Sequence, residues 1–202
     1  MALTLTKGAN LSLTKHDPDF IHIQVGLGWD PRTTVGEQFD LDASVILVTA
    51  TGKVRGESDF VFYNQLGDVT LADGKHADPD RACVIHQGDN RDGSGDGDDE
   101  QIVVDLSKIP ADVTRLIFVA SIDQADTRNQ NFGQVRNAYI RLVNIDSNVE
   151  VVRFDLSEDS STETALLFAE IYRDNGEWKF KAVSQGYANG LAGVARDFGL
   201  PF

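Results

Sequence analysis

Acidic side chains and glycines alternate in residues 88–100, whose sequence is GDNRDGSGDGDDE. Like charges at this spacing repel one another, and a bound hard cation would relieve that repulsion. Ca²⁺ takes roughly 6 to 8 oxygen ligands, and glycine lets the main chain bend to present them. The segment therefore predicts a calcium-binding loop, with carboxylates available from Asp89, Asp92, Asp96, Asp98, Asp99 and Glu100. A solvated acidic turn without an ion is the alternative interpretation.

Two known calcium-binding templates do not fit this segment. An EF-hand frame that starts at Asp89 places Arg91 and Gly93 at ligand positions, and it places Ser94 where the template needs glycine. Residues 101–106 (QIVVDL) indicate a strand, whereas an EF-hand loop is followed by a helix. The calcium-binding nonapeptide of parallel β-helices needs tandem copies, and this chain has one copy.

Length, composition and charge exclude several classes of protein. With 202 residues, 41% of them hydrophobic, residues 1–202 are expected to form a single domain. A formal net charge of -14 opposes binding to nucleic acid or to anionic lipid. The single cysteine, Cys83, excludes an intramolecular disulfide and a cysteine zinc cluster. The chain shows neither a secretory signal nor a bilayer-spanning stretch, so we expect a cytoplasmic protein without direct membrane insertion.

Short stretches with period-two hydrophobicity recur along the chain, separated by turn residues. Asn175-Gly176 predicts a tight hairpin turn, and Lys7-Gly8-Ala9 predicts a second hairpin near the start of the chain. Residues 67–81 predict an exposed excursion, residues 127–134 a helical turn or loop, and Gly190–Phe198 a short helix. The predicted strands are Leu3–Thr6, Asn10–Thr14, Ile21–Trp29, Phe39–Val48, Asp59–Asn64, Gln101–Leu106, Arg115–Ile122, Ala138–Asn144, Val149–Leu156, Thr164–Tyr172 and Trp178–Val183.

Because strands and helices do not alternate regularly, these elements predict a mainly all-β fold: an antiparallel two-sheet β-sandwich with a short C-terminal helix. An antiparallel barrel is the alternative fold. The period of two places Asp40 and Asp42 side by side on one strand face. Gly26 and Gly28 indicate the close approach of another backbone. Trp29 is expected to pack beneath the acidic loop.

Several blocks of this sequence resemble those of the TerD family, the tellurium-resistance and stress-response group. The similarity covers nearly the whole chain, in order, through VGLGWD (25–30), FDLDAS (39–44), DFVFYN (59–64), GDNR (88–91), GDGDDE (95–100), FGQV (132–135), FDLSED (154–159), GEWKF (176–180) and GY (186–187). Two departures stand out. The excursion at 67–81 is longer than the family pattern, and Asp92-Gly93-Ser94 stands where Thr-Gly-Glu is common, which leaves the ligand there open.

The resemblance implies a calcium-binding β-sandwich, with two ions held between the acidic loop and a neighbouring acidic strand, in bacteria that resist tellurite. Where the motifs match, the implied ligands are Asp40, Asp42, Asn64, Asp89, Asn90, Asp96, Asp98, Asp99 and Glu100. Ligation by oxygen alone suits Ca²⁺ better than zinc or copper, while Mg²⁺ prefers a rigid octahedron with retained waters.

We therefore expect a noncatalytic, calcium-binding stress-response protein associated with tellurite resistance. It would act through calcium-dependent stabilisation or through assembly with other stress-response proteins. The alternative is a metal-dependent hydrolase that uses two metals in the acidic cluster to activate water. Arg91 is the only cation in the loop, and the chain has no nucleophile elbow, phosphate-cradling loop or dinucleotide fingerprint. Direct chelation of tellurite, an anion, is not expected of so acidic a chain.

Overall fold

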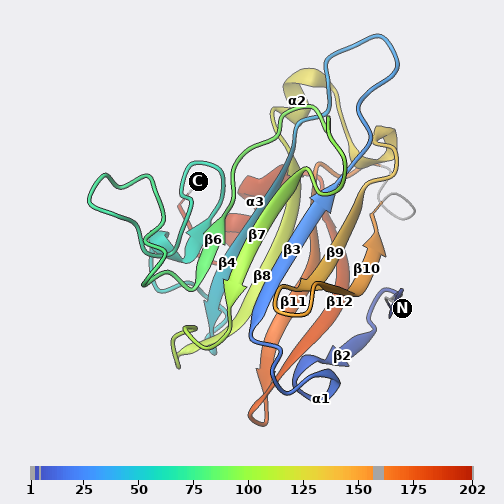
Figure 1. Ribbon diagram of the computed structural model, residues 1–202. Helices are drawn as coiled ribbons and strands as arrows, with labels where there is room; N and C mark the ends of the chain where they lie inside the picture. The colour runs from blue at the N-terminus through green and yellow to red at the C-terminus, as the bar shows by residue number, and fades with distance from the viewer. Residues whose placement is uncertain (1–2, 5, 157–161, 202) are drawn as a thin grey trace.

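The computed structural model, which describes residues 3–4, 6–156 and 162–201, contains two six-stranded sheets packed face to face (Figure 1). The strand order is β1-β10-β9-β3-β7-β6 in the first sheet and β2-β12-β11-β8-β4-β5 in the second. The strands are β1 (Leu3–Thr4), β2 (Asn10–Ser12), β3 (His22–Gly28), β4 (Leu41–Thr49), β5 (Phe60–Val61), β6 (Val84–His86), β7 (Glu100–Asp105), β8 (Val113–Ile122), β9 (Tyr139–Asn144), β10 (Val149–Asp155), β11 (Ala165–Asp174) and β12 (Glu177–Tyr187). The predicted two-sheet β-sandwich is confirmed, and the barrel alternative is wrong.

Helices are few and short in the described part of the chain. They are α1 (Leu13–His16), α2 (Ala125–Arg128) and α3 (Gly190–Asp197), with 3₁₀ turns η1 (Glu57–Asp59) and η2 (Phe132–Gln134). The predicted C-terminal helix is confirmed as α3, which ends one residue earlier than expected. Among the described residues, no helix has the length and apolar character needed to cross a membrane.

The core lies between the sheets, and a smaller apolar cluster lies under α3 on the outer face of the second sheet. Strand β4 contributes to both. Leu41 and Val45 face the core, whereas Ile46 and Val48 belong to the outer cluster with Val194 of α3. Because both faces of β4 are covered, its C-terminal half is a continuous apolar run, VILV, instead of an alternating one.

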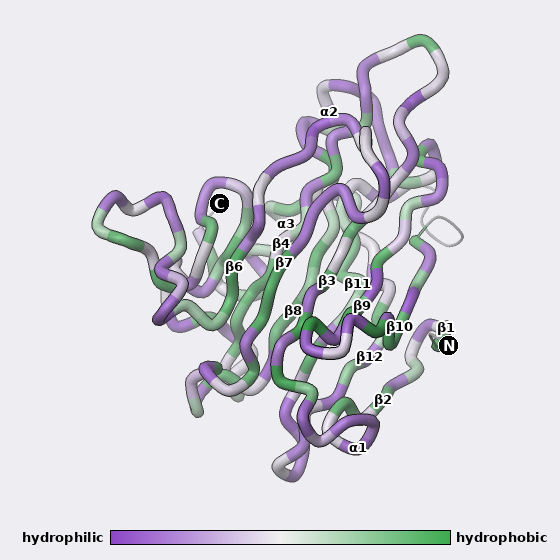
Figure 2. The backbone as a smooth tube through the Cα atoms, viewed as in Figure 1, coloured by the Kyte–Doolittle hydropathy of each residue, from purple (hydrophilic) through white to green (hydrophobic). Residues whose placement is uncertain are grey.

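Long connections gather at one end of the sandwich, which is the upper end in Figure 1. This end holds residues 30–38, the acidic loop 88–99 and α2, while α1 and the β11–β12 turn lie at the opposite end. Figure 2 shows hydrophobic residues along the strands and mainly hydrophilic ones in the loops of this end. The fold therefore brings together acidic segments that are distant in the sequence.

The predicted hairpin at the start of the chain is wrong. β1 pairs with β10 in parallel in the first sheet, whereas β2 pairs with β12 in the second. Ser12 then caps α1 by accepting a hydrogen bond from the N–H of Lys15. Each segment completes the edge of a different sheet, where it satisfies backbone groups that would otherwise be unpaired. The alternating pattern predicts the extended conformation of Leu3–Thr4 and Asn10–Ser12, but Leu13 and Thr14, expected in the second strand, begin α1, and the pairing partners of both strands are distant in sequence.

Two further predictions need correction, and one strand was missed. The strand expected at 59–64 is reduced to η1 and β5, since Phe62 and Gln65 form an isolated bridge that turns the chain back. Strand β6 was not predicted. Gly26 and Gly28 do mark close approaches, but the neighbours are side chains instead of backbone: a Cβ on Gly26 would lie 2.1 Å from a carboxylate oxygen of Asp98.

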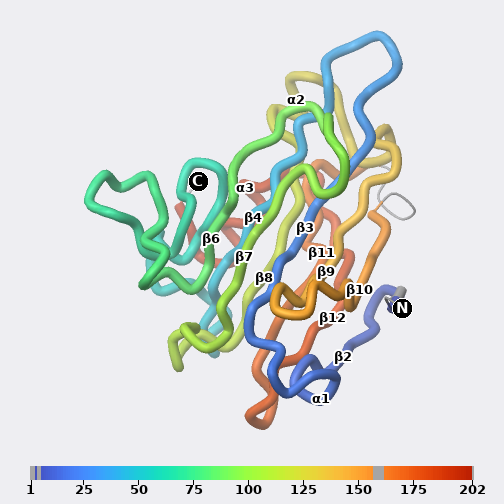
Figure 3. The backbone as a smooth tube through the Cα atoms, viewed as in Figure 1, coloured from blue at the N-terminus to red at the C-terminus, as the bar shows by residue number. Residues whose placement is uncertain are grey.

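Two other local predictions are confirmed. Asn175 and Gly176, with φ of 52° and 82°, form the turn between β11 and β12, as expected for a two-residue hairpin of this sequence. Residues 67–81 form an excursion that projects from the sandwich beside β6 (Figure 3). Its inner end is anchored where Asp68 Oδ1 accepts the N–H groups of Cys83 and Val84.

Candidate functional site

The acidic loop is shaped by its own short polar side chains. Asn90 Oδ1 accepts hydrogen bonds from the N–H groups of Asp92 and Gly93, and Asp92 Oδ1 accepts one from Ser94. Gly93 has a φ of +69°, and a Cβ there would lie 2.5 Å from Nε1 of Trp29. The loop therefore needs glycine at this position for two independent reasons, its left-handed backbone and its close neighbour.

Trp29 packs beneath this loop, as predicted. Its side chain is buried, its N–H donates to Asp99 Oδ2 at 2.9 Å, and its indole Nε1 donates to the carbonyl oxygen of Phe39 at 3.1 Å. The tryptophan thus links the acidic loop to the residue that precedes the Asp40–Asp42 segment. Order in the loop and order at the start of β4 are coupled through one side chain.

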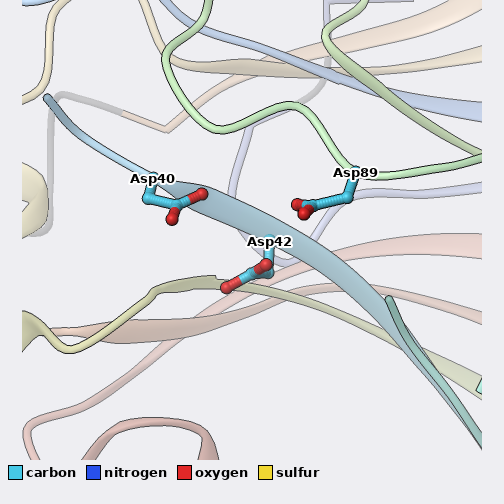
Figure 4. A group of neighbouring side chains, drawn as sticks. All are labelled: Asp40, Asp42 and Asp89. Atoms are coloured by element: carbon cyan, nitrogen blue, oxygen red, sulfur yellow. The ribbon is translucent and has the colours of Figure 1, made fainter. Parts of the chain in front are cut away.

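Three carboxylates converge where the acidic loop meets the start of β4. One oxygen from each of Asp40, Asp42 and Asp89 lies within 4.8 Å of the others, and we call this group the triad (Figure 4). Asp40 and Asp42 share a face because they are two residues apart at the start of β4, as the sequence predicts. Asp89 comes from the acidic loop and faces them. The fold therefore joins the predicted acidic strand to the predicted acidic loop.

Two of the triad carboxylates have an arginine nearby, since Asp89 pairs with Arg91 at 2.9 Å and Asp40 Oδ2 lies 3.7 Å from Arg128, but buried oxygens of the group remain without a hydrogen bond. Asp40 Oδ1 is buried and without a hydrogen-bond partner, and the Asp42 carboxylate accepts no hydrogen bond within the described ranges. Burial, reinforced by Asp89 and Asp123, raises the pKa of Asp40 to about 6. Burial, reinforced mainly by Glu100, raises the pKa of Asp42 to about 8. Such a group of acids is stabilised when a cation replaces the protons.

Asp123 is a member of the site that sequence reasoning missed. It directly follows β8, its N–H donates to the carbonyl oxygen of Asp40 at 2.8 Å, and its charge raises the pKa values of Asp40 and Asp42. The triad and Asp123 line a cavity of about 230 Å³ together with Tyr63, Arg91, Gln124 and Arg128. The sequence does show that Asp123 is an acidic residue at the end of a predicted strand, but it does not show that this strand pairs with β4.

The remaining acidic candidates in the loop make contacts within the protein. Asp98 is fully buried at its carboxylate, which accepts two hydrogen bonds from Arg141, at 2.6 and 3.0 Å, and others from Gln24 and Tyr139. Glu100 is buried in β7 and accepts the N–H of Ala43. These carboxylates fix the loop to the sheets, and neither belongs to the triad.

Four predicted ligands lie elsewhere in or near the loop. Asn64 and Asp96 are exposed, Asn90 donates to Asp99 Oδ1 at 3.1 Å, and Asp99 accepts the N–H of Trp29. Asp96 and Asp99 line a separate cavity of about 590 Å³ with Asp30 and Asp155, but among the described residues no three of these carboxylates approach one another as closely as those of the triad. The prediction of a second ion therefore stays a prediction.

The donor set of the triad fits a hard divalent cation. Three carboxylates from two segments supply oxygen ligands only, as Ca²⁺ and Mg²⁺ prefer, and no histidine or cysteine lines the cavity in the described part of the chain. The unpartnered Asp40 Oδ1 is a buried acceptor that a cation would satisfy. Loop flexibility and carboxylate-only donors suit Ca²⁺ better than the strict octahedron of Mg²⁺.

Cys83 is remote from this chemistry. Its thiol is buried and donates to Asp68 Oδ2 at 3.0 Å, and burial together with that carboxylate raises its pKa well above the usual range. A thiolate is the reactive form of cysteine, so this side chain is held in the unreactive state.

Comparison with known proteins agrees with this architecture. Residues 1–198 match the family model described as the TerD domain. The chain is 54% identical over 200 residues to the tellurium resistance protein TerD of Serratia marcescens, covering 99% of this chain and 98% of that one. It is 47% identical over 201 residues to general stress protein 16U of Bacillus subtilis (strain 168), covering 99% and 98%.

A solved structure supports the fold alone. It is a homologue of the telluride resistance protein TerD from Streptomyces coelicolor A3(2), with a TM-score of 0.67, 21% identity, and coverage of 90% of this chain and 99% of that chain. Fold and sequence together define a β-sandwich protein related to tellurium-resistance and stress-response proteins. The chain belongs to the TerD family.

Proposed function

We propose that this protein is a noncatalytic calcium-binding protein of the stress response, associated with tellurite resistance as its relatives' names indicate. The observation that carries the proposal is the triad, in which Asp40, Asp42 and Asp89 bring oxygens within 4.8 Å and leave buried Asp40 Oδ1 unpartnered. Asp123 is a further oxygen donor at the same cavity. We assign one Ca²⁺ to this position.

The bound ion would act as a structural clasp between three segments. The triad joins the acidic loop to the start of β4, and Asp123 adds the end of β8. Without a cation, these carboxylates repel one another and favour separation of the loop from the sheet. With Ca²⁺ the loop is held in place, and the ordered end of the sandwich becomes a surface to which other stress-response proteins can bind.

The charges around the cavity support a noncatalytic role. Arg91 pairs with Asp89 at 2.9 Å, and Arg128 pairs with Asp123 at 3.3 Å and with Glu37 at 3.2 Å. Both cations thus compensate local carboxylates, whereas a two-metal hydrolase needs cations free to stabilise the transition state. Within the described residues, the triad also offers one compact ligand group instead of a pair of adjacent metal sites.

Calorimetric titration with Ca²⁺ tests the proposal. Wild-type protein should bind calcium, while Asp42→Asn and Asp89→Asn should each weaken binding at least tenfold, because each removes a charged ligand. Asp19→Asn is the matched control, since Asp19 is exposed and its carboxylate makes no contact within the described ranges. Wild type that binds no calcium, or triad variants that bind as tightly as Asp19→Asn, would refute the assignment.

A further inference from the structure

A second cavity, of about 350 Å³, adjoins the triad cavity. The two share Asp42, Tyr63, Asp123 and Gln124 as lining residues. The opposite wall of the second cavity is the start of α3, residues 189–192. Its volume lies near the lower limit for small-molecule sites. A ligand here would contact the triad region on one side and a helix N-terminus on the other.

Two buried polar side chains line this cavity without a partner. Ser121 is 3% exposed, and its hydroxyl makes no hydrogen bond to any described residue. Asp42, at 5% exposed, likewise accepts none within the described ranges. Buried polar groups are nearly always hydrogen-bonded, so the unpaired Ser121 hydroxyl on the cavity wall indicates a polar occupant, whereas the Asp42 carboxylate is directed to the ion of the triad.

The first turn of α3 supplies unpaired donors at the opposite wall. Asn189 makes no side-chain cap, and no described residue accepts a hydrogen bond from the N–H groups of Gly190, Leu191 or Ala192. Free N–H groups and the helix dipole give this end a partial positive charge that favours an anion. Thr164 Oγ1 lies close by, as a Cβ on Gly190 would be 3.4 Å from it.

An anion alone would nevertheless be repelled from this cavity. Asp42, Asp123 and Asp126 line it, and no described lysine or arginine does. A divalent cation at the triad changes this balance, because three carboxylates fill about half of the six to eight calcium coordination positions. An oxygen of the anion could occupy one of the remaining positions while other oxygens accept from α3 and Ser121.

We propose that the second cavity binds a phosphoryl group, as inorganic phosphate or at the end of a small phosphate monoester, between the triad's calcium ion and the first turn of α3. This inference rests on the proposed function, because binding requires the ion. The neutral donors of Tyr63, Ser121 and Asn189 would fix the orientation of the phosphoryl oxygens. The protein would then recognise a phosphorylated metabolite only in the calcium-loaded state.

The test measures calcium binding first and phosphoryl binding second, by calorimetry on full-length protein. Calcium-loaded wild type is titrated with inorganic phosphate and, in a separate arm, with glycerol 3-phosphate, each below the concentration at which its calcium salt precipitates. Binding in either arm supports the proposal, and the tighter arm identifies free phosphate or a monoester as the source. In chelator, both affinities should fall at least a hundredfold. By linkage, the bound phosphoryl compound should tighten calcium binding by the same factor.

Asn189→Asp separates the phosphoryl site from the calcium site. Aspartate is a favourable residue at a helix N-terminus, so the variant should fold, yet its charge occupies the place of the anion. We expect calcium binding within about threefold of wild type and phosphoryl binding at least tenfold weaker. Asn175→Asp, at the distant β11–β12 turn, adds the same charge and should bind like wild type. Ser121→Ala should weaken phosphoryl binding about fivefold, the effect of one hydrogen bond.

The outcomes distinguish the two proposals. Protein that binds calcium but neither phosphoryl compound overturns this inference and leaves the proposed function standing. Equal phosphoryl binding with and without calcium, or wild-type binding by Asn189→Asp, also overturns it. Failure of wild type to bind calcium overturns both proposals.

Discussion

Replacing Asp42 by asparagine should destabilise the protein in the presence of calcium but not in its absence. In chelator, the Asp42 carboxylate is a buried acid without a hydrogen-bond partner in the described structure, and burial beside Glu100 raises its pKa to about 8. Asparagine has nearly the same size and no charge. The variant should therefore be as stable as wild type, or more stable, in the absence of calcium.

The expected magnitudes follow from the pKa and from ligand linkage. One pKa unit corresponds to about 1.4 kcal/mol, and at pH 7 only the roughly three units between the ordinary pKa of 3.8 and the solution pH count, because the raised pKa of about 8 lies above pH 7. The cost of this carboxyl at pH 7 therefore has an upper limit of about 4 kcal/mol. The asparagine amide is also buried and incompletely paired, which reduces the net gain to about 1 kcal/mol. Calcium at about 100 times its Kd adds roughly 2.7 kcal/mol to wild type, most of which the variant should lose.

Thermal denaturation in chelator and in excess calcium would measure both effects. For a chain of this length, about 1 kcal/mol shifts Tm by roughly 2 to 4 °C. The Tm of Asp42→Asn should exceed that of wild type by a few degrees in chelator and should be about 5 °C lower, or more, in calcium. Asp19→Asn should follow wild type in both conditions. An equal loss of Tm with and without calcium would mean that Asp42 is a structural residue and not a ligand.

Three further predictions concern pH, the loop and the outer cluster. In chelator, the raised pKa values of Asp40 and Asp42, about 6 and about 8, contribute stability that is complete below pH 4 and is lost as pH rises through 8. Urea unfolding that shows rising stability from about pH 5 to about pH 8.5 would contradict this. Gly93→Ala should weaken calcium binding and alter the fluorescence emission of Trp29 in a Trp178→Phe background, because the added methyl group forces the loop away from the indole. Unchanged affinity and emission would show that the loop accommodates the methyl group without moving the ligands. Phe60→Ala should lower the free energy of unfolding by about 3 to 5 kcal/mol in chemical denaturation, and Phe62→Ala should lower it less. The Phe60 ring is buried, whereas the Phe62 ring, whose centroid lies 4.5 Å from that of Phe60, is partly exposed. A larger loss for Phe62→Ala than for Phe60→Ala would be inconsistent with this burial.

Much of the fold was predictable because strands carry local signals. Period-two patterning located most of the strands, Asn175-Gly176 specified the turn between β11 and β12, and the apolar face of α3 was visible in Gly190–Phe198. The same periodicity predicted that Asp40 and Asp42 share one face, where they form part of the triad. Composition and spacing also identified the acidic loop, since charge density is a property of a short segment.

Tertiary structure alone decided which of the acidic residues form the site. Asp98 looks like its neighbours in sequence, but its carboxylate forms an ion pair with Arg141 of β9. Asp123 looks like an ordinary residue after a strand, but the pairing of β8 with β4 brings it to the triad. Likewise, β1 and β2 have similar patterns and join opposite sheets. A segment's own residues determine its local conformation and its polar face, whereas contacts with distant strands determine which charge meets an arginine and which is left for a cation.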